Sequence, residues 1–539
     1  MSSANGRQDL SALGVQDLSA LGIQALVDPG KTPTDEQVRV IEAPRRPLLV
    51  VAGAGSGKTE TMSMRVLWLV ANHEDIAPSS VLGLTFTRKA AGELGDRLRQ
   101  RLALLAGRVP SLRERLDEDP VSLTYNSFAE RIVAEHGMRI GIDPDFTMLT
   151  EAGAVDLMTQ IVEGWPTDLD EDLSPSAAVG HCLHLAGEVG EHGYTVEEAR
   201  DALEGFGRDL EQIGATNDTA RKTLRANARR LAYLGPVEEF QRRKREGGLL
   251  DFSDQLVLAT RIVREAPAVR AQVRDEFQAV LLDEFQDTSV IQMELLSLLF
   301  HDHAVTAVGD PNQAIYGWRG ASASSLERFL DRFQDGPAQP GQTLTLSTAW
   351  RNDRNILRAA NRVAAPLREH SRAAKSPVLR ARPGAGEGRV DVAYTQDYRS
   401  ALGAVVDFVS AHRARGTREG KWPTTAVLCR RRSDFPYVDM ALREAGVPTQ
   451  IVGLGGLLDQ PSVQDARAAL VLADDVEASP WLARLLAGID LGAADLVALG
   501  DWARHLAREE GRDPHRAVLL DAVDNPPEPG WSASGGARG

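Results

Sequence analysis

A glycine-rich segment between an apolar run and a helical pattern constrains this chain more than any other feature. Residues 52–59 read AGAGSGKT and follow the apolar residues 48–51, which have the length and composition of a buried strand. Met62, Val66 and Val70 then recur at helical spacing. A strand, a glycine loop and a helix in this order form a phosphate-binding P-loop, because the loop amides and the helix N-terminus point at phosphate oxygens. The sequence therefore predicts a nucleoside triphosphate site rather than a flexible turn.

Individual residues of this P-loop have expected roles. The Lys58 ammonium can reach the β- and γ-phosphates, and the Thr59 hydroxyl can ligate Mg²⁺. The first position of the motif is Ala52, where the strict pattern has glycine. The nucleotide-binding residues predicted from this segment are Ala52, Gly53, Ala54, Gly55, Ser56, Gly57, Lys58, Thr59 and Glu60.

Two further apolar runs end in polar groups. Residues 279–282 lead into DEFQD at 283–287, and residues 304–308 lead into GDPNQ at 309–313. Because the carboxyl ends of parallel strands meet at one edge of a sheet, these groups are expected beside the P-loop. Asp283 is the candidate Mg²⁺ ligand, and Glu284 is the candidate base that orients and deprotonates the attacking water. Asp310 and Gln313 are expected within reach of the same nucleotide.

Gln37 has two compatible interpretations. Thr34 and Gln37 stand at the positions of a helix capping box, and that box alone would explain the glutamine. Its place just before the strand that feeds the P-loop also allows a contact with the base of the nucleotide.

Aromatic and basic residues after two of the strands predict contact with nucleic acid. Tyr316 and Trp318 are flanked by glycines and followed by Arg319, a setting that favours stacking on unpaired bases over a place in the core. Arg88 opens a predicted helix, where a cation suits phosphate contact, and Phe86 either packs in the core or meets a base.

A mostly helical stretch, residues 106–248, interrupts the α/β pattern and is predicted to be an insertion. It carries a basic run, for which a solvated helix face and a functional basic surface are equally compatible. The run comprises Arg221, Lys222, Arg225, Arg229 and Arg230, followed by the basic residues of 242–245.

Composition narrows the class of protein. The 539 residues are 43% hydrophobic and 25% charged, as in ordinary globular proteins, and no apolar run approaches a membrane span or a signal peptide. The two cysteines, Cys182 and Cys429, are far apart and fit a reducing compartment without a disulfide or metal framework. A cytoplasmic protein without membrane contact is expected. The net charge of −15 does not exclude DNA, because a local basic groove can coexist with an acidic exterior.

In their residue sequences and in their order along the chain, these motifs resemble those of the UvrD/Rep/PcrA branch of superfamily 1 DNA helicases. The resemblance extends from about residue 32 to about residue 470. Residues 451–461 (IVGLGGLLDQP) further resemble actinobacterial AdnAB-type or RecB-like motor subunits. Asn126 stands where the family usually has histidine, and Trp350 where tyrosine is commoner. The residues that carry the resemblance are Gln37, 52–59, 85–91 (TFTRKAA), 250–254 (LDFSD), 283–287, 309–320 and the pair Trp350 and Arg351.

The resemblance implies an α/β fold of two RecA-like P-loop NTPase lobes, each built on a parallel sheet. The first lobe would comprise residues 31–105 and 249–345, with residues 106–248 as its helical insert. An incomplete second lobe would follow at 346–470, with strands at 390–393, 426–428 and 450–452. Residues 1–30 are expected to form a flexible leader, and residues 471–539 the start of a second insert with a low-complexity tail.

The resemblance also implies ATP and Mg²⁺ as cofactors and assigns roles to single residues. Gln37 would read the adenine, which Arg65 and Trp350 would sandwich, and Arg351 would lie at the γ-phosphate. The implied catalytic residues are Lys58, Glu284, Gln313 and Arg351, the metal ligands Thr59 and Asp283, and the DNA-binding residues Phe86, Arg88, Tyr316 and Trp318.

The function implied is that of an ATP-dependent 3′→5′ DNA helicase in repair or recombination, acting on single-stranded or duplex DNA, with a second motor or nuclease subunit as a further expected partner. Nothing after Pro461 resembles the motifs that complete the second lobe, so the chain is expected to be truncated at its C-terminus. An ATP- and DNA-binding fragment without unwinding activity is therefore the alternative. A non-helicase P-loop ATPase, the third interpretation, predicts no stimulation by single-stranded DNA.

Overall fold

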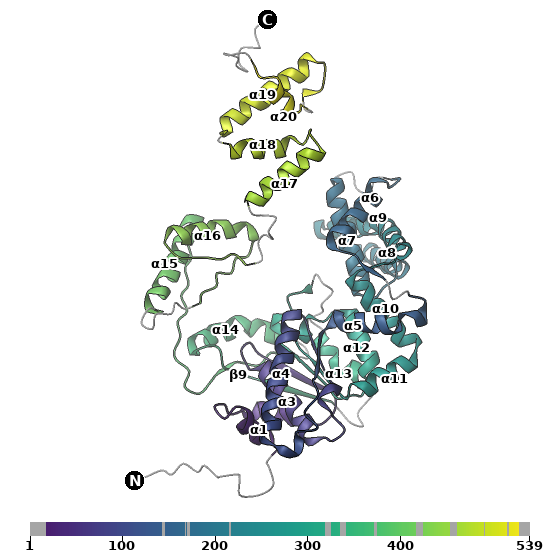
Figure 1. The fold of residues 1–539 in the computed structure, drawn as a ribbon, viewed down its shortest axis with the longest axis vertical. Coiled ribbons are helices and arrows are strands. Elements are labelled where there is room, and N and C mark those ends of the chain that lie inside the picture. The colour runs from purple at the N-terminus through teal and green to yellow at the C-terminus, as the bar shows by residue number, and fades with distance from the viewer. Residues whose placement is uncertain are drawn as a thin grey trace. The chain divides into compact units, whose positions relative to one another are not determined.

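The chain forms two compact units, Met1–Val390 and Asp391–Gly539, which are described separately. The computed structural model, shown in Figure 1, describes residues 18–142, 146–167, 169, 173–214, 217–317, 325–334, 341–370, 375–416, 424–452, 461–489, 491–514 and 517–527.

The first unit is built on a six-stranded sheet in which every neighbouring pair of strands is parallel, in the order β3-β2-β6-β7-β1-β8. Strands β1, β2, β6 and β7 are buried along their whole length, as expected of a sheet covered on both faces. This parallel sheet confirms the predicted α/β P-loop fold. The strands are β1 Leu48–Ala52, β2 Val81–Thr85, β3 Val121–Thr124, β6 Ala279–Leu282, β7 Val305–Gly309 and β8 Gln342–Leu346.

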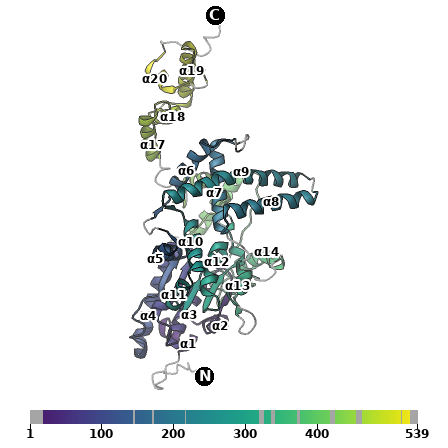
Figure 2. The same cartoon turned by 90° about the vertical axis from the view of Figure 1, so that its right-hand side faces the viewer.

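Alternate residues of each strand face opposite helical layers. Leu48 and Val50 belong to a core with the first set of helices, while Leu49 and Val51 belong to a core with the second set. Figures 1 and 2 show the two layers around the sheet. The first layer contains α1 Ala20–Val27, α2 Asp35–Ile41, α3 Lys58–Asn72 and α4 Arg88–Arg108. The second contains α5 Tyr125–His136, α10 Phe252–Glu265, α11 Pro267–Glu276, α12 Val290–Phe300 and α13 Ser325–Phe333.

Helix α1 corrects the predicted flexible leader (residues 1–30) from residue 18 onward; the earlier residues lie outside the described part of the chain. Ala20 and Ile23 are fully buried and Val27 is 8% exposed, so this helix is part of the core. The Ser19 hydroxyl caps it by accepting from the Gly22 amide at 3.1 Å. A single apolar stripe is enough to hold so short a helix, because α3 and α4 already present an apolar surface.

The helical insert begins later than predicted. Strand β3 pairs with β2, and helix α5 packs into the second core, so residues 121–136 belong to the sheet domain rather than to the insert predicted at 106–248. The insert proper is bounded by a short parallel pair, β4 Thr147–Met148 and β5 Leu249–Leu250. It has its own apolar core, and Figure 2 shows α8 and α9 lying alongside each other. Its helices are α6 Glu151–Glu163, α7 Pro175–Glu191, α8 Val196–Gln212 and α9 Asp218–Glu246.

The strands predicted for a second lobe are not formed. Residues 390–393, 426–428 and 450–452 carry no ladder pairing, and Val392, Leu428 and Val452 are 91%, 94% and 84% exposed. A strand needs a neighbour for its backbone N–H and C=O groups, and an apolar pattern does not provide one. Among the residues that the structure describes, the prediction of strands at these three places is therefore wrong.

The remaining elements are short or helical. The first unit ends with β9 Thr348–Ala349, paired in parallel with β10 Arg380–Ala381, and with α14 Arg354–His370. None of the described helices is long and apolar enough to cross a membrane. The second unit contains α15 Tyr398–Gly416, α16 Phe435–Glu444, α17 Pro461–Asp474, α18 Ser479–Gly488, α19 Ala493–Glu509 and α20 Leu519–Asp524. The 3-10 turns are Pro78–Ser80, Pro110–Leu112, Gly137–Ile140, Phe285–Asp287, Pro311–Gln313 and Arg432–Asp434.

Candidate active site

The loop between β1 and α3 has the backbone of a phosphate cradle. Gly55 and Gly57 have φ angles of 73° and 82°, a region that side chains rarely adopt. A Cβ on Gly55 would lie 2.8 Å from the Arg351 Cβ, and one on Gly57 would lie 3.0 Å from the Gln37 Nε2. No side chain caps the start of α3, so its first amides remain for a ligand. These features fit a phosphate group.

Other loop residues are placed around this cradle. Ala52 is the buried last residue of β1, and Ala54 is half-buried. The buried Ser56 hydroxyl has no hydrogen-bond partner among the described residues. A Cβ on Gly53 would meet the tip of the Leu379 side chain, which would have to move to accept a larger residue there. The structure thus supports the predicted loop but leaves its contacts with a nucleotide as a prediction.

Lys58 and Glu284 face each other across this site. The Lys58 Nζ lies 3.3 Å from the Glu284 Oε2, and the lysine side chain is 13% exposed. Glu284 has a φ of 49°, which is unusual for a residue with a side chain. Backbone strain of this kind gathers at functional sites, where surrounding contacts enforce it. The strained backbone therefore directs the Glu284 carboxylate toward the P-loop lysine.

Asp283, the first residue after β6, lies in a poorly solvated position. Burial, followed by repulsion from Glu284, raises the pKa of Asp283 to about 6. Its carbonyl oxygen accepts a hydrogen bond from the Tyr125 hydroxyl at 2.9 Å, which anchors the end of the strand. Thr59 and Asp283 line one cavity of about 500 Å³. A hydroxyl and a carboxylate beside a phosphate cradle are the oxygen donors that Mg²⁺ uses, so these residues fit the ion.

Gln286 connects the polar groups behind this cavity. It is 2% exposed, and its Nε2 donates to the Glu284 Oε2 at 2.8 Å and to the Asp287 Oδ2 at 3.2 Å. Its Oε1 accepts the Asp310 amide at 3.0 Å, and Gln313 donates to the Asp310 carboxylate at 2.7 Å. The polar run after β6 indicated this region, but the role of Gln286 was not predicted from the sequence.

Trp350 lies beside the P-loop, as the adenine prediction requires. Its amide donates to the Gly55 carbonyl at 2.8 Å, and its side chain is 39% exposed. Gln37 closes the capping box with Thr34 and also donates to the Thr61 hydroxyl at 3.2 Å. The capping interpretation of Gln37 is confirmed, and its contact with a base stays a prediction.

Arg65 does not take part in this site, so its predicted place against the adenine is wrong. The side chain is 1% exposed, and its Nε donates to the Thr306 hydroxyl at 2.9 Å. Burial lowers the pKa of the Arg65 guanidinium to about 10. With its nitrogens engaged inside the core, the guanidinium offers no face to a nucleotide. Its remaining nitrogens donate to the carbonyl oxygens of Val40, Ile41, Ala43 and Pro44.

Glu60 and Arg351 are two other residues predicted to bind nucleotide, and they contact different parts of the structure. Both carboxylate oxygens of Glu60 accept from Arg101 Nη2, at 2.6 and 2.7 Å, which ties α3 to α4. Glu60 thus has a structural contact of its own. Arg351 is exposed, and its Cβ lies next to Gly55, while its contact with a γ-phosphate stays a prediction.

The predicted DNA-binding residues are brought together in part. The Phe86 and Tyr316 rings stack with centroids 5.1 Å apart and planes at 27°, and both line the cavity that Thr59 and Asp283 share. Arg88 is exposed at the first residue of α4, whose N-cap is Thr87. Trp318 lies outside the described residues.

Comparison with known proteins decides the family. Residues 33–334 match the family model described as the UvrD/REP helicase N-terminal domain. The chain belongs to the UvrD/Rep helicase family. The match covers five of the six strands of the sheet, all but β8, together with the P-loop, the insert and the polar residues after β6 and β7.

Individual relatives agree with this family. A protein named DNA helicase II from Haemophilus influenzae is 26% identical over 492 residues, which are 91% of this chain and 60% of the relative. DNA helicase II from Escherichia coli is 28% identical over 440 residues, which are 81% and 54% of the two chains. ATP-dependent DNA helicase PcrA from Staphylococcus epidermidis is 26% identical over 438 residues, which are 81% and 53%. The chain thus spans between half and two thirds of these relatives. The further resemblance to actinobacterial motor subunits stays a prediction.

Replacing Asp283 by asparagine is expected to stabilise this UvrD/Rep-family chain at pH 7.5 while removing Mg²⁺-dependent hydrolysis. With a folded-state pKa near 6, the ionised carboxylate is disfavoured by folding, so neutral asparagine should raise the free energy of unfolding by on the order of 1–3 kcal/mol. In the parent chain, stability contributed by this group should increase as the pH falls through 6 toward 4, because the folded state binds the proton first.

Urea unfolding of both chains without Mg²⁺, at pH 7.5 and pH 5, checks this expectation. The difference in the free energy of unfolding between the two chains should be smaller at pH 5 than at pH 7.5. Asp117→Asn, at an exposed aspartate, is the matched control and should leave stability unchanged at both pH values. A destabilised Asp283→Asn chain at pH 7.5 would contradict the interpretation that the ionised Asp283 carboxylate is poorly solvated in the folded state.

Proposed function

We propose that this chain is the motor part of an ATP-dependent UvrD-type DNA helicase that moves 3′→5′ along single-stranded DNA in repair or recombination. One observation carries the proposal: a single cavity is lined both by Thr59, Asp283 and Glu284 and by the stacked rings of Phe86 and Tyr316. Groups suited to phosphate hydrolysis and groups suited to base stacking therefore share one opening. Relatives named DNA helicase II and PcrA support the same function.

The pair of Lys58 and Glu284 suggests how hydrolysis is prepared. A triphosphate in the P-loop competes for the Lys58 ammonium, because phosphate oxygens accept charge-assisted hydrogen bonds. Glu284, released from that contact, can orient and deprotonate the attacking water. Thr59 and Asp283 would hold Mg²⁺, which neutralises charge on the phosphate oxygens when bound. Arg351 and Gln313 contribute at the γ-phosphate in this proposal, and Gln37 and Trp350 at the adenine.

The Gln286 hydrogen bonds offer a path from hydrolysis to DNA. Gln286 contacts Glu284 on one side and the Asp310 amide on the other. Asp310 begins the segment that carries Tyr316, and Asp287 accepts a backbone hydrogen bond from Ile315, next to that tyrosine. A change in the contacts of Glu284 therefore reaches the stacking residue through buried polar groups.

Tyr316→Ala is expected to weaken binding of single-stranded DNA by about 1–3 kcal/mol, with little dependence on base sequence, because a base–aromatic stack is lost. Fluorescence anisotropy with labelled oligonucleotides of two different sequences measures this change. Tyr394→Ala, at a fully exposed tyrosine in the other unit, is the matched control and should bind like the parent chain. Unchanged affinity of Tyr316→Ala, together with a lowered melting temperature, would place Tyr316 in the core instead.

The proposed function is tested by three measurements on the full chain: ATP turnover alone, ATP turnover with single-stranded DNA, and strand displacement. A helicase motor requires stimulation by single-stranded DNA and displacement of the paired strand. No stimulation would indicate a P-loop ATPase of another class.

A second candidate is an ATP- and DNA-binding fragment without unwinding activity. The exposed apolar residues at 390–393, 426–428 and 450–452, which pair with no strand in the described part of the chain, favour it. It predicts binding of ATP and single-stranded DNA without strand displacement. A second motor or nuclease subunit remains a prediction of the family resemblance, and adding such a chain would test it.

A further inference from the structure

The carboxylate of Glu36, in the first turn of α2, holds a residue that lies far away in the sequence. Its Oε2 accepts a hydrogen bond from the Ser347 amide and its Oε1 accepts one from the Ser347 hydroxyl, both at 2.7 Å. Ser347 is 5% exposed, so its donors are shielded from water and depend on this carboxylate. The Ser347 carbonyl oxygen accepts from the Arg380 amide at 2.8 Å. The backbone of Ser347 is therefore fixed on both sides.

Ser347 begins the short segment that leads to Trp350. It directly follows β8, and β9 comes next. Trp350 then returns to the P-loop, where its amide donates to the Gly55 carbonyl at 2.8 Å. Because its side chain is 39% exposed, surrounding atoms cover only part of it, and its position follows the course of this backbone. A shift of Ser347 would therefore displace the tryptophan.

Gly57 shows that Trp350 and Gln37 approach the same point of the P-loop. A Cβ on this glycine would lie 3.7 Å from the Trp350 Cδ1 and 3.0 Å from the Gln37 Nε2. Gln37 directly follows Glu36 in the first turn of α2. The start of α2 thus provides one of the two side chains expected at the adenine and, through Ser347, holds the backbone that carries the other.

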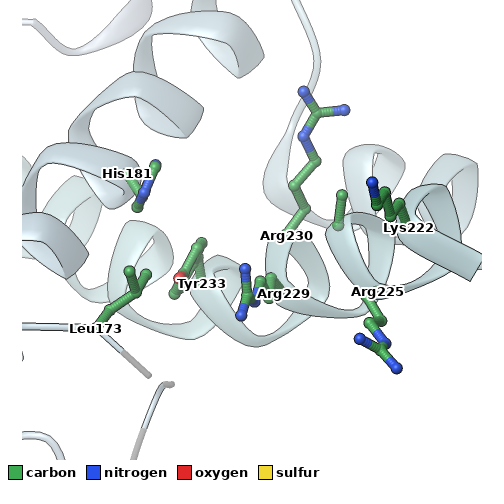
Figure 3. A pocket seen from close by; sticks show the side chains of 8 residues that line it. Leu173, His181, Lys222, Arg225, Arg229, Arg230 and Tyr233 are labelled. Atoms are coloured by element: carbon green, nitrogen blue, oxygen red, sulfur yellow. The ribbon is translucent and has the colours of Figure 1, made fainter. Parts of the chain in front are cut away.

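A pocket in the helical insert has no part in this arrangement. Figure 3 shows its lining, in which Lys222, Arg225 and Arg230 project from α9. All the described residues that line it lie between residues 173 and 233, within the insert. The side chains that can select the base of a nucleotide in the P-loop are therefore those beside the loop, among them Gln37 and Trp350.

We propose that Glu36 is a positioning residue for the nucleotide base: by holding Ser347, it keeps Trp350 in place to stack on adenine. Glu36 acts through the tryptophan, because its own oxygens are engaged by Ser347. It therefore sets the affinity for adenine nucleotides and the preference for adenine over smaller bases, which offer less area for stacking. The inference rests on the proposed function, which takes Gln37 and Trp350 as adenine contacts.

The variants differ in how much of this hold they remove. A base–aromatic stack contributes roughly 5- to 150-fold in affinity, which is the loss expected for Trp350→Ala. Glu36→Ala should lose part of it, about 5- to 20-fold for ADP. Glu36→Gln should stay within about threefold of the parent chain, because glutamine can accept from the Ser347 amide and donate to its hydroxyl. Asp35→Ala is the matched control: it removes the same charge from the same turn at an exposed aspartate, and should bind like the parent.

Isothermal titration calorimetry of the full chain with Mg²⁺ measures the dissociation constants of ADP, CDP and inorganic tripolyphosphate. In Glu36→Ala the ratio of the CDP constant to the ADP constant should fall. Tripolyphosphate, which has no base, should bind this variant within about twofold of the parent chain. The double variant Glu36→Ala/Trp350→Ala should bind ADP no more weakly than Trp350→Ala, because the carboxylate acts through the tryptophan.

Ser347→Ala provides a milder change in case Glu36→Ala does not fold, which a thermal melt establishes. This variant loses the hydroxyl contact but keeps the backbone contact with Glu36. It should weaken ADP binding by about two- to fivefold, the effect of one hydrogen bond, and leave tripolyphosphate binding unchanged.

Equal losses of affinity for ADP and for tripolyphosphate would overturn the inference, because the effect would then not depend on the base. Losses that add up in the double variant would overturn it too, since Glu36 would act independently of Trp350. A parent chain that binds ADP and CDP equally would overturn the inference and leave the proposed ATP site intact. A parent chain that binds neither ADP nor tripolyphosphate would overturn the proposed function as well.

Discussion

Lys58→Ala is expected to lower ATP turnover by at least ~10²–10³-fold while leaving the chain folded. The Lys58 ammonium is the P-loop cation, and loss of one preorganised electrostatic contact to a reacting group costs about this much. The folded state should tolerate the change, because among the described residues the Lys58 side chain donates its hydrogen bond to Glu284, which is 39% exposed and can be solvated. Steady-state ATP hydrolysis and a thermal melt of the same preparation measure both parts of the expectation.

The matched control for Lys58 is Lys89→Ala. Lys89 also lies in the first turn of a helix that follows a strand of the sheet, but its side chain is 86% exposed and pairs with Glu93 at 3.8 Å. This control should retain parental turnover. Parental turnover in a folded Lys58→Ala chain would refute the assignment of the P-loop as the hydrolysis site.

Arg65→Ala is expected to lower the free energy of unfolding by roughly 3–5 kcal/mol, the cost of removing one partner from a buried charged network. The guanidinium donates to the Thr306 hydroxyl and to carbonyl oxygens in the turn from α2 to β1. Without it, these buried acceptors lose their partners, and a cavity remains beside β7. Arg65→Lys should recover only part of the loss, because an ammonium cannot reproduce the planar fork of donors.

Urea unfolding of the full chain measures this loss of stability. Arg88→Ala, at an exposed arginine, should change the free energy of unfolding by less than about 0.5 kcal/mol. The adenine-stacking interpretation predicts the opposite pattern for Arg65→Ala, with an increased KM for ATP and unchanged stability. That pattern would show that the buried guanidinium leaves its carbonyl partners when nucleotide binds.

Much of the candidate site could be predicted because the residues that specify it lie close to one another in the sequence. The residues 48–51 and 279–282 are continuous apolar runs, as strands covered on both faces require, and both form strands of the sheet. The P-loop glycines follow from backbone geometry within a few residues of each other. Asp283 and Glu284 were located by their place directly after such a strand, where parallel topology gathers the strand ends.

Other predictions failed where the deciding partner is distant in sequence. Arg65 occurs in a helix beside apolar residues, and only the packing of the turn after α2 shows that carbonyl oxygens surround it. Gln286 joins Glu284 to Asp310 because β6 and β7 are neighbours in the sheet. Neither contact leaves a periodic signal in the sequence.

The sequence by itself determined the P-loop, the polar groups that follow the apolar runs before it and after it, and the family, since short motifs specify backbone conformation and chemistry locally. Tertiary structure alone decided which apolar runs became strands in a sheet and which polar side chains met. Val121–Thr124 joined β2 although it lay in the predicted insert, whereas residues 390–393 found no strand in the described part of the chain. The physical reason is that a strand is completed by hydrogen bonds to another strand, and a buried charge by acceptors from other segments.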